Sequence, residues 1–264
     1  MTSTGLDAVE ARAAAAGGAG KRAYVRRMFS EIAPRYDLLN HVLSLNIDRG
    51  WRRTALDELG WRHAPDAVYL DLCAGTLDVG AMLARSEGFR GTVIGADFAE
   101  PMLRRGLGKA DPARLSAVAG DALALPLADG KVQGAIVAFG VRNLVDLDAG
   151  FREVRRVLRP GGRFVILEFS TPPSALVRGA YRMYSHRVLP AIGRLVSGHP
   201  TAYQYLPESV DAFPGPEALA DRLRRAGFSE VRWRHLTFGV VAVHVGCREP
   251  EAGPATMATR PRRP

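Results

Sequence analysis

Short apolar runs alternate with longer amphipathic segments through most of the chain. Seven runs rich in Val, Ile and Leu have the length and composition of strands, and helical periodicity lies between the first five. This alternation predicts a parallel sheet with helices on both faces, and the last two runs predict a closing antiparallel hairpin. The predicted strands cover residues 67–72, 92–97, 115–119, 132–138, 163–168, 230–235 and 240–246.

The first apolar run breaks into a turn of small residues before a helical pattern begins. Asp71 lies in the run, and Gly75 and Thr76 lie in the turn. Because Ala74 and Gly75 carry little or no side chain, a ligand can approach the backbone there, and the N–H groups of the following helix point at it. The stretch therefore predicts a binding loop of the nucleotide type.

Two further strands end in acidic residues. Asp97 ends the second strand, where α/β nucleotide sites place a carboxylate against ribose hydroxyls. Asp121 and Ala122 follow the third strand, where a carboxylate and backbone amides can bind the edge of an adenine. Since the carboxyl ends of parallel strands meet at one edge of a sheet, these residues and the loop predict a single cofactor pocket.

The loop departs from the dinucleotide-binding fingerprint. Gly-x-Gly-x-x-Gly is absent, and the loop reads Asp71-x-x-x-Gly75-Thr76-x-Asp78 instead. This pattern disfavours a nicotinamide oxidoreductase. S-adenosylmethionine has no phosphate, and its ammonium, sulfonium and hydroxyl groups suit acidic residues, an open glycine and a hydroxyl. We therefore predict S-adenosylmethionine as the cofactor, with Asp97 holding the ribose.

Composition is that of a soluble enzyme. The chain of 264 residues is 47% hydrophobic and 24% charged, enough for one domain with a full core. No uncharged apolar run has the length of a membrane span and no signal-peptide pattern is seen, so we expect a cytoplasmic protein. Two cysteines argue against a disulfide scaffold, and no His/Cys/Asp cluster has metal-ligand spacing, so no metal is expected. His244, among small apolar residues, is expected in the core.

The two ends of the chain lack helical or strand periodicity. Residues 1–20 are rich in Ala, Gly and Thr, and residues 249–264 consist largely of Pro, Arg and small residues, so both are predicted to be disordered tails. Residues 21–248 are predicted to form a single domain. Its first part, residues 21–60, is predicted to form a helical cap over the site.

The net charge of +9 is unevenly distributed. A basic chain can bind nucleic acid, but no added binding module is visible and no nucleic-acid partner is expected. Residues 172–206 form an insert before the hairpin in which arginines alternate with apolar residues and no acidic residue occurs. Such an insert suits an anionic membrane surface or a lid over an apolar substrate. A pair of ordinary helices with solvated arginines is the alternative.

Four separated blocks carry a family resemblance. Residues 28–44 read Met-Phe-x-x-Ile-Ala-x-Arg-Tyr-Asp-Leu-Leu-Asn-x-x-Leu-Ser, and residues 156–170 read Arg-Val-Leu-Arg-Pro-Gly-Gly-Arg-Phe-Val-Ile-Leu-Glu-Phe-Ser. Two further blocks are a short one at residues 139–143 and a discontinuous one spread over residues 203–244. In these blocks the chain resembles the ubiquinone/menaquinone-biosynthesis C-methyltransferases, over about residues 22–247.

The resemblance implies a class I S-adenosylmethionine-dependent methyltransferase with a Rossmann-like, mostly parallel seven-stranded sheet. The implied reaction transfers a methyl group to a ring carbon of a polyprenyl hydroquinone, demethylmenaquinol in the first instance, or the benzoquinol of ubiquinone biosynthesis. Ring carbon becomes nucleophilic when the neighbouring hydroxyl is deprotonated. Such a substrate implies peripheral association with the inner face of the cytoplasmic membrane, and a homodimer is a candidate assembly.

The resemblance also implies candidate catalytic residues. Arg142 and Asn143 follow the fourth strand at the carboxyl edge of the sheet, and Arg142 is a candidate to stabilise the developing phenolate. Tyr36 is a candidate to relay a proton or pack on the ring, and Asp37 or His41 to act as a base through water. The structural alternatives are a core position for Tyr36, a helix cap for Asp37 and a surface position for His41.

Three positions depart from the family pattern. Leu77 stands where a second loop glycine is usual, Asp48 where one signature has histidine, and Ala138 where a hydroxyl residue belongs to the cofactor site. A leucine forced to positive φ would be strained by about 1 kcal/mol or more. These departures leave open a relative that methylates another phenolic or natural-product substrate, and a non-catalytic cofactor-binding protein. The predicted cofactor-binding residues are Asp71, Gly75, Thr76, Asp97, Asp121, Ala122 and Ala138.

Overall fold

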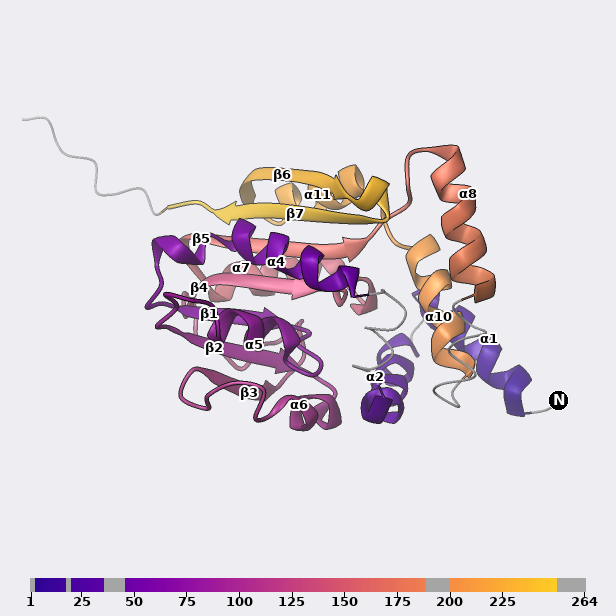
Figure 1. Ribbon diagram of the computed structural model, residues 1–264, viewed down its shortest axis with the longest axis horizontal. Coiled ribbons are helices and arrows are strands. Elements are labelled where there is room, and N and C mark those ends of the chain that lie inside the picture. Colours follow the sequence, from indigo (N-terminus) through magenta and orange to yellow (C-terminus); the bar gives the residue numbers. More distant parts are fainter. Residues whose placement is uncertain (1–2, 18–19, 36–45, 189–199, 251–264) are drawn as a thin grey trace, which may run out of the picture.

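A seven-stranded sheet forms the centre of the molecule (Figure 1). The computed structural model describes residues 3–17, 20–35, 46–188 and 200–250. The strand order is β3-β2-β1-β4-β5-β7-β6, in which β1 to β5 are parallel and β7 runs antiparallel to both of its neighbours. The predicted Rossmann-like sheet with a C-terminal hairpin is therefore confirmed.

The predicted strands are all present, and the later ones are longer than expected. The fifth strand begins at Leu158 rather than at residue 163, because its first residue already pairs with Val132 before a register shift. The strands are β1 Val68–Leu72, β2 Thr92–Asp97, β3 Leu115–Ala119, β4 Val132–Ala138, β5 Leu158–Phe169, β6 Phe228–Leu236 and β7 Val241–Arg248.

Helices cover both faces of the sheet. On one face α4 (Ile47–Leu59), α5 (Asp78–Ala84) and α6 (Glu100–Gly106) bury apolar side chains in one core cluster. On the other face α7 (Leu147–Val157) and α11 (Pro216–Arg225) do so in a second cluster. Strands buried on both faces explain the nearly continuous apolar runs of the sequence.

The helix expected between the third and fourth strands does not form. Residues 120–131 lie wholly within the described chain and contain turns and an isolated bridge between Asp121 and Ala124. Pro126 lacks the amide hydrogen that a helix interior needs, and Gly130 has a φ of 60°. This connection therefore stays open at the end of β3, where it leaves Asp121 and the residues after it at the sheet edge.

Three helices form a third layer at the carboxyl end of the parallel strands (Figure 1). They are α1 (Ser3–Ala15), α2 (Lys21–Ile32) and α10 (Pro200–Asp211), and side chains of all three share a core cluster. The predicted disordered tail over residues 1–20 is therefore wrong for residues 3–15. Alanine is the strongest helix former, but a run of alanines has little periodicity, so the buried face of α1 was not visible in the sequence.

The expected cap and insert differ in extent from the observed elements. Of the cap, α2 belongs to the third layer, whereas α4 packs on the sheet instead. The insert contains α8 (Ala175–Met183), the single turn η4 (Tyr184–Val188) and the start of α10. Residues 189–199 of the insert and 251–264 of the predicted C-terminal tail lie outside the described residues.

Candidate active site

The loop after β1 alternates between left-handed and ordinary backbone. Cys73, Gly75 and Leu77 have φ values of 52°, 52° and 63°. Leu77 therefore adopts the positive φ that its position in the family pattern implied, although only glycine does so without cost. Its side chain is fully buried in the core beneath the loop. The loop is thus held in a tight turn whose backbone N–H groups face the end of β2.

Asp97 fixes this loop from the end of β2. Its Oδ2 accepts a hydrogen bond from the Gly75 N–H at 2.9 Å, and its Oδ1 accepts one from the Ala99 N–H at 2.8 Å. Burial raises the pKa of Asp97, and these backbone hydrogen bonds oppose that shift. A carboxylate offers about four lone-pair sites, so Asp97 retains capacity to accept ribose hydroxyls.

Asp71 lies below the loop rather than in the pocket. Its Oδ2 accepts a hydrogen bond from the Gly80 N–H at 2.8 Å, in the first turns of α5, and burial raises its pKa to about 7. Thr76 is buried as well, and Ala138 packs against the sheet core. Like Gly75, these three predicted cofactor residues lie outside the lining of the pocket described next.

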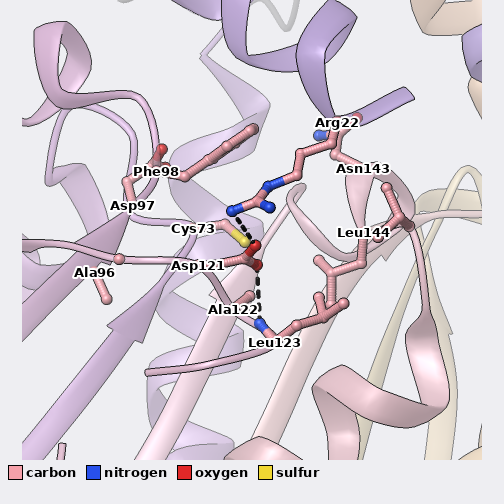
Figure 2. A pocket seen from close by; sticks show the side chains of 12 residues that line it. Arg22, Cys73, Ala96, Asp97, Phe98, Asp121, Ala122, Leu123, Asn143 and Leu144 are labelled. Carbon is pink, nitrogen blue, oxygen red and sulfur yellow. Dashed lines mark hydrogen bonds and ion pairs between the residues drawn. The ribbon is translucent and has the colours of Figure 1, made fainter. Parts of the chain in front are cut away.

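A pocket opens at the carboxyl ends of β1, β2 and β3 (Figure 2). It brings together the predicted residues Asp97, Asp121, Ala122 and Asn143. Asp121 accepts a hydrogen bond from the Leu123 N–H at 3.0 Å through Oδ1. Its Oδ2 forms an ion pair with the guanidinium of Arg22 on α2, at 2.7 Å. The remaining lining residues are Arg22, which makes that ion pair, Cys73, Ala96, Phe98, Gly120, Leu123, Leu144 and Val145.

The chemistry of the pocket lining suits an adenosine group. Apolar side chains and a phenyl ring form its walls, which suits a purine. The carboxylate of Asp97 suits ribose hydroxyls, and that of Asp121 suits the exocyclic amino group of adenine. The open backbone at Gly75 would admit the methionine part of S-adenosylmethionine. When bound, this cofactor supplies an electrophilic methyl group.

Beside the pocket, Arg142 forms a buried ion pair with Glu168. Arg142 lies in the short turn η3 (Val141–Asn143) after β4, and Nη1 approaches Oε1 of Glu168 at 2.9 Å. The Arg142 N–H donates to Glu168 Oε2 at 3.2 Å, and its Nε donates to Ser209 Oγ on α10 at 3.3 Å. Nη1 also donates to the carbonyl of Phe139. The arginine charge is therefore compensated, and its main effect is to hold η3 in place.

Asn143 connects the turn to the third layer. Its Oδ1 accepts a hydrogen bond from the Tyr205 hydroxyl at 3.1 Å, while the residue itself lines the pocket. Two of the three predicted catalytic residues, Arg142 and Asn143, thus lie together beside the cofactor pocket. Tyr36, Asp37 and His41 lie outside the described residues.

Comparison with known proteins identifies the family. The ubiE/COQ5 methyltransferase family matches residues 18–248. The chain belongs to this family. Demethylmenaquinone methyltransferase of Thermus thermophilus is 52% identical over 224 residues, which cover 84% of the chain and 100% of that relative. The protein of the same name from Mycobacterium marinum is 47% identical, over 84% of the chain and 92% of the relative.

Solved structures agree with this assignment to the ubiE/COQ5 methyltransferase family at the level of the fold. A SAM-dependent methyltransferase of Thermotoga maritima aligns with a TM-score of 0.56 and 18% identity, over 84% of the chain and 99% of that structure. Phosphoethanolamine N-methyltransferase 2 of Haemonchus contortus, solved with S-adenosyl-L-methionine, aligns with a TM-score of 0.54 and 16% identity. The alignment covers 75% of the chain and 53% of that structure. The expectation of an S-adenosylmethionine-dependent methyltransferase is confirmed.

Several residues of this family member's site were not anticipated. Glu168 had a signal, since it is the one acidic residue in the apolar end of β5 and lies at the carboxyl edge of the sheet. Phe98 could also have been predicted from the sequence, because it directly follows Asp97, a predicted pocket residue. Lys21 and Arg22 reach the site from α2, and the sequence has no local feature that predicts this approach. Within the described part of the chain, we find no acidic, histidine and cysteine cluster suited to a metal ion.

Proposed function

We propose that this enzyme transfers a methyl group from S-adenosylmethionine to a ring carbon of demethylmenaquinol, giving menaquinol. The observation that carries the proposal is the 52% identity with the Thermus demethylmenaquinone methyltransferase along the whole of that relative. The site supports it, because a pocket lined by Asp97 and Asp121 lies next to the turn that carries Arg142 and Asn143. A benzoquinol acceptor is the second candidate.

In this mechanism the protein binds, orients and excludes water. Asp97, Asp121 and the Gly75 turn hold the cofactor, and the Glu168–Arg142 pair fixes η3 so that Asn143 faces the pocket. The acceptor hydroxyl would lose a proton to solvent water, and the resulting phenolate would place negative charge on the ortho carbon. That carbon would bond to the cofactor methyl group, with S-adenosylhomocysteine as the leaving group, and the ring would then lose the proton of that carbon to water. Alignment of two bound reactants can lower such a barrier by about 7–11 kcal/mol.

We further propose that the acceptor reaches the site from the cytoplasmic face of the membrane, at the surface formed by α8 and η5 (Thr237–Gly239). Every side chain of α8 is at least partly exposed, and Leu176, Met183 and Phe238 are 84%, 60% and 81% exposed. Leu176 and Met183 are seven residues apart, so they share one helix face. The η5 turn lies against the segment between β5 and α8, because the Ser170 hydroxyl donates to the Gly239 carbonyl at 2.6 Å, and Pro172 and Pro173 are close to Gly239.

Charge favours an anionic bilayer as the partner of this surface. Arg182 and Arg187 are exposed on the same insert, and residues 170–188 contain no acidic residue. Each basic residue near an anionic membrane contributes about 1 kcal/mol to binding. Among the described residues, no helix combines the length and the apolar character that crossing a bilayer requires. Contact would therefore be peripheral, in the manner of an interfacial helix.

Methyl transfer from labelled S-adenosylmethionine tests the reaction. The purified enzyme would receive prenylated demethylnaphthoquinol and the corresponding benzoquinol separately, under reducing conditions. Label on the naphthoquinol ring carbon supports the proposal. Label on the benzoquinol alone would assign the enzyme to the methylation step of ubiquinone biosynthesis instead. If neither is labelled while S-adenosylhomocysteine still binds, the quinol assignment fails and another phenolic substrate or a binding-only role gains support.

Vesicle flotation tests the membrane surface. We expect the enzyme to float with vesicles containing phosphatidylglycerol, and Leu176→Glu with Met183→Glu to abolish flotation. Leu107→Glu is the matched control, because Leu107 is 61% exposed after α6 and away from α8. Equal flotation of both variants, or flotation with neutral vesicles alone, would contradict the proposed surface.

A further inference from the structure

Lys21 is a buried cation at the start of α2. It is 8% exposed, and its Nζ donates to the backbone carbonyl of Arg142 at 2.8 Å. Within the described chain no carboxylate pairs with it. Burying an ammonium group is costly unless it is paired, and the amino end of a helix is an unfavourable place for positive charge. A position that opposes stability in two ways is a candidate for a functional role.

The neighbouring cation cannot fill that role. The reaction places negative charge on the acceptor oxygen, so a nearby positive charge would lower the barrier. Arg142 is compensated by the Glu168 carboxylate, and its guanidinium also binds Ser209 and the Phe139 carbonyl. Lys21 contacts the same turn through the Arg142 backbone carbonyl. An ammonium has three donors, and the Arg142 carbonyl takes one of them.

We infer that Lys21 is a positioning residue for methyl transfer: it fixes η3 through the Arg142 carbonyl and, with no carboxylate partner among the described residues, supplies positive charge that favours the acceptor phenolate. The inference rests on the proposed function. It assigns to α2 a role beyond covering the pocket. The adjacent Arg22 pairs with Asp121 at 2.7 Å (Figure 2), so the first turn of α2 contacts both the pocket and η3.

The surroundings of Lys21 are consistent with an electrostatic role. Burial and, to a smaller extent, the Arg142 guanidinium lower the pKa of Lys21. A positive charge held in a buried setting acts more strongly than one in water. The charged group that acts on Lys21 is the Arg142 guanidinium on η3, the turn whose backbone carbonyl accepts the Lys21 hydrogen bond.

The test compares three substitutions of Lys21 with a matched control. Lys21→Met removes the charge and the hydrogen bond, Lys21→Gln keeps a donor without charge, and Lys21→Arg keeps the charge. Lys131→Met is the control, because Lys131 is exposed at the opposite end of β4. The measurements are kcat and KM for the prenylated naphthoquinol across pH, the affinity for S-adenosylhomocysteine by calorimetry, and the melting temperature.

We expect kcat of Lys21→Met to fall about 100- to 1,000-fold, the range for one lost donor that stabilises transition-state charge. The rising limb of its kcat–pH profile should move to higher pH, because the acceptor hydroxyl ionises less readily. The rising limb of the kcat–pH profile should be displaced equally in Lys21→Gln, and Lys21→Arg should return it to the wild-type position. The affinity of each variant for S-adenosylhomocysteine should stay within about threefold of the wild-type value.

The electrostatic role would be overturned if the rising limb of the kcat–pH profile did not move in Lys21→Met, or if Lys21→Gln had the wild-type kcat and pH profile. A parallel loss of S-adenosylhomocysteine affinity would assign Lys21 to the cofactor pocket instead and overturn the inference. If Lys21→Met does not fold, Lys21→Gln and Lys21→Arg decide between charge and hydrogen bond. The wild-type enzyme separates the two proposals: no turnover of the naphthoquinol overturns the proposed function and this inference with it, whereas turnover with an unchanged limb overturns the inference alone.

Discussion

The side chain of Leu77 occupies the space that Gly95 leaves open on β2. A methyl group added to Gly95 would collide with Cδ2 of Leu77, and one added to Gly106 would lie 2.7 Å from its Cγ. Leu77 therefore gains complete burial at a backbone conformation that disfavours it. Burial of a leucine contributes about 1.5–3 kcal/mol, which offsets a left-handed backbone cost of about 1–2 kcal/mol.

We expect Gly95→Ala to lower the free energy of unfolding by about 1–3 kcal/mol, the usual effect of overpacking. Adding Leu77→Gly should relieve the collision. The double variant should therefore lose less free energy of unfolding than the two single variants lose together, by about 0.5–3 kcal/mol. Urea denaturation measures both. Gly50→Ala on α4 is the control, since no atom lies within 4 Å of an added Cβ there. Strict additivity of the pair would show that the two residues are not coupled.

Asp97→Asn should weaken cofactor binding about 10- to 100-fold. The asparagine keeps one acceptor oxygen, so it cannot hold the Gly75 and Ala99 N–H groups through two oxygens and still accept ribose hydroxyls. Calorimetry with S-adenosylhomocysteine measures the effect. Asp66→Asn is the matched control, because Asp66 is an exposed residue that pairs with Arg90. Unchanged affinity would mean that the ribose is held elsewhere.

Glu168→Gln should be strongly destabilising, by about 3–5 kcal/mol, because it leaves the buried Arg142 charge without its partner. We expect kcat to fall as η3 loosens, whereas S-adenosylhomocysteine should bind with little change, since Glu168 does not line the pocket. Chemical denaturation and calorimetry separate the two effects. A stable Glu168→Gln protein with normal kcat would show that the ion pair neither supports the fold nor orients the turn.

Acid should destabilise the protein through His244. Burial lowers the pKa of His244 to about 4, and its Nε2 donates to the Pro216 carbonyl at 2.9 Å. Because the native pKa lies below the unfolded value of about 6.5, the unfolded state binds the proton first. The stability that His244 contributes is complete above about pH 6.5 and is lost as the pH falls towards 4, by about 3 kcal/mol.

Urea denaturation between pH 4 and 7 would measure this loss. His244→Gln, which keeps a donor for Pro216, should remove most of the difference between pH 4 and 7. His63→Gln, at an exposed position, should leave the wild-type pH dependence intact. An equally steep loss in His244→Gln would assign the acid sensitivity to other groups.

The sequence was most informative where one physical rule governs a segment. Period and length located all seven strands, and the acidic strand ends placed Asp97 and Asp121 in one pocket because parallel strands end at a common edge. The expectation that His244 is a core residue is confirmed, since it is 1% exposed. The extent of β5 was wrong because its glycine-rich start pairs across a register shift.

Contacts between distant segments were the part that sequence could not supply. Whether Asp71 faces the ligand or the helix below it depends on the path of the loop, and here it binds Gly80. The Glu168–Arg142 pair and the approach of Lys21 join residues from three separate elements. Helix α1 was missed since its buried face consists of alanines, which have neither charge nor periodicity to reveal a partner.

The pairing of α1 with α10 has a consequence for how the enzyme is made. Arg12 and Glu208, which bridge the two helices at 3.1 Å, are 196 positions apart in the chain. During synthesis the first helix leaves the ribosome long before α10 exists, so it cannot make this contact while strands β1 to β5 are being made. Tyr205, whose hydroxyl binds Asn143, is made with α10. The contacts of α10 with α1 and with the turn at Asn143 can therefore form only after the five parallel strands have been synthesised.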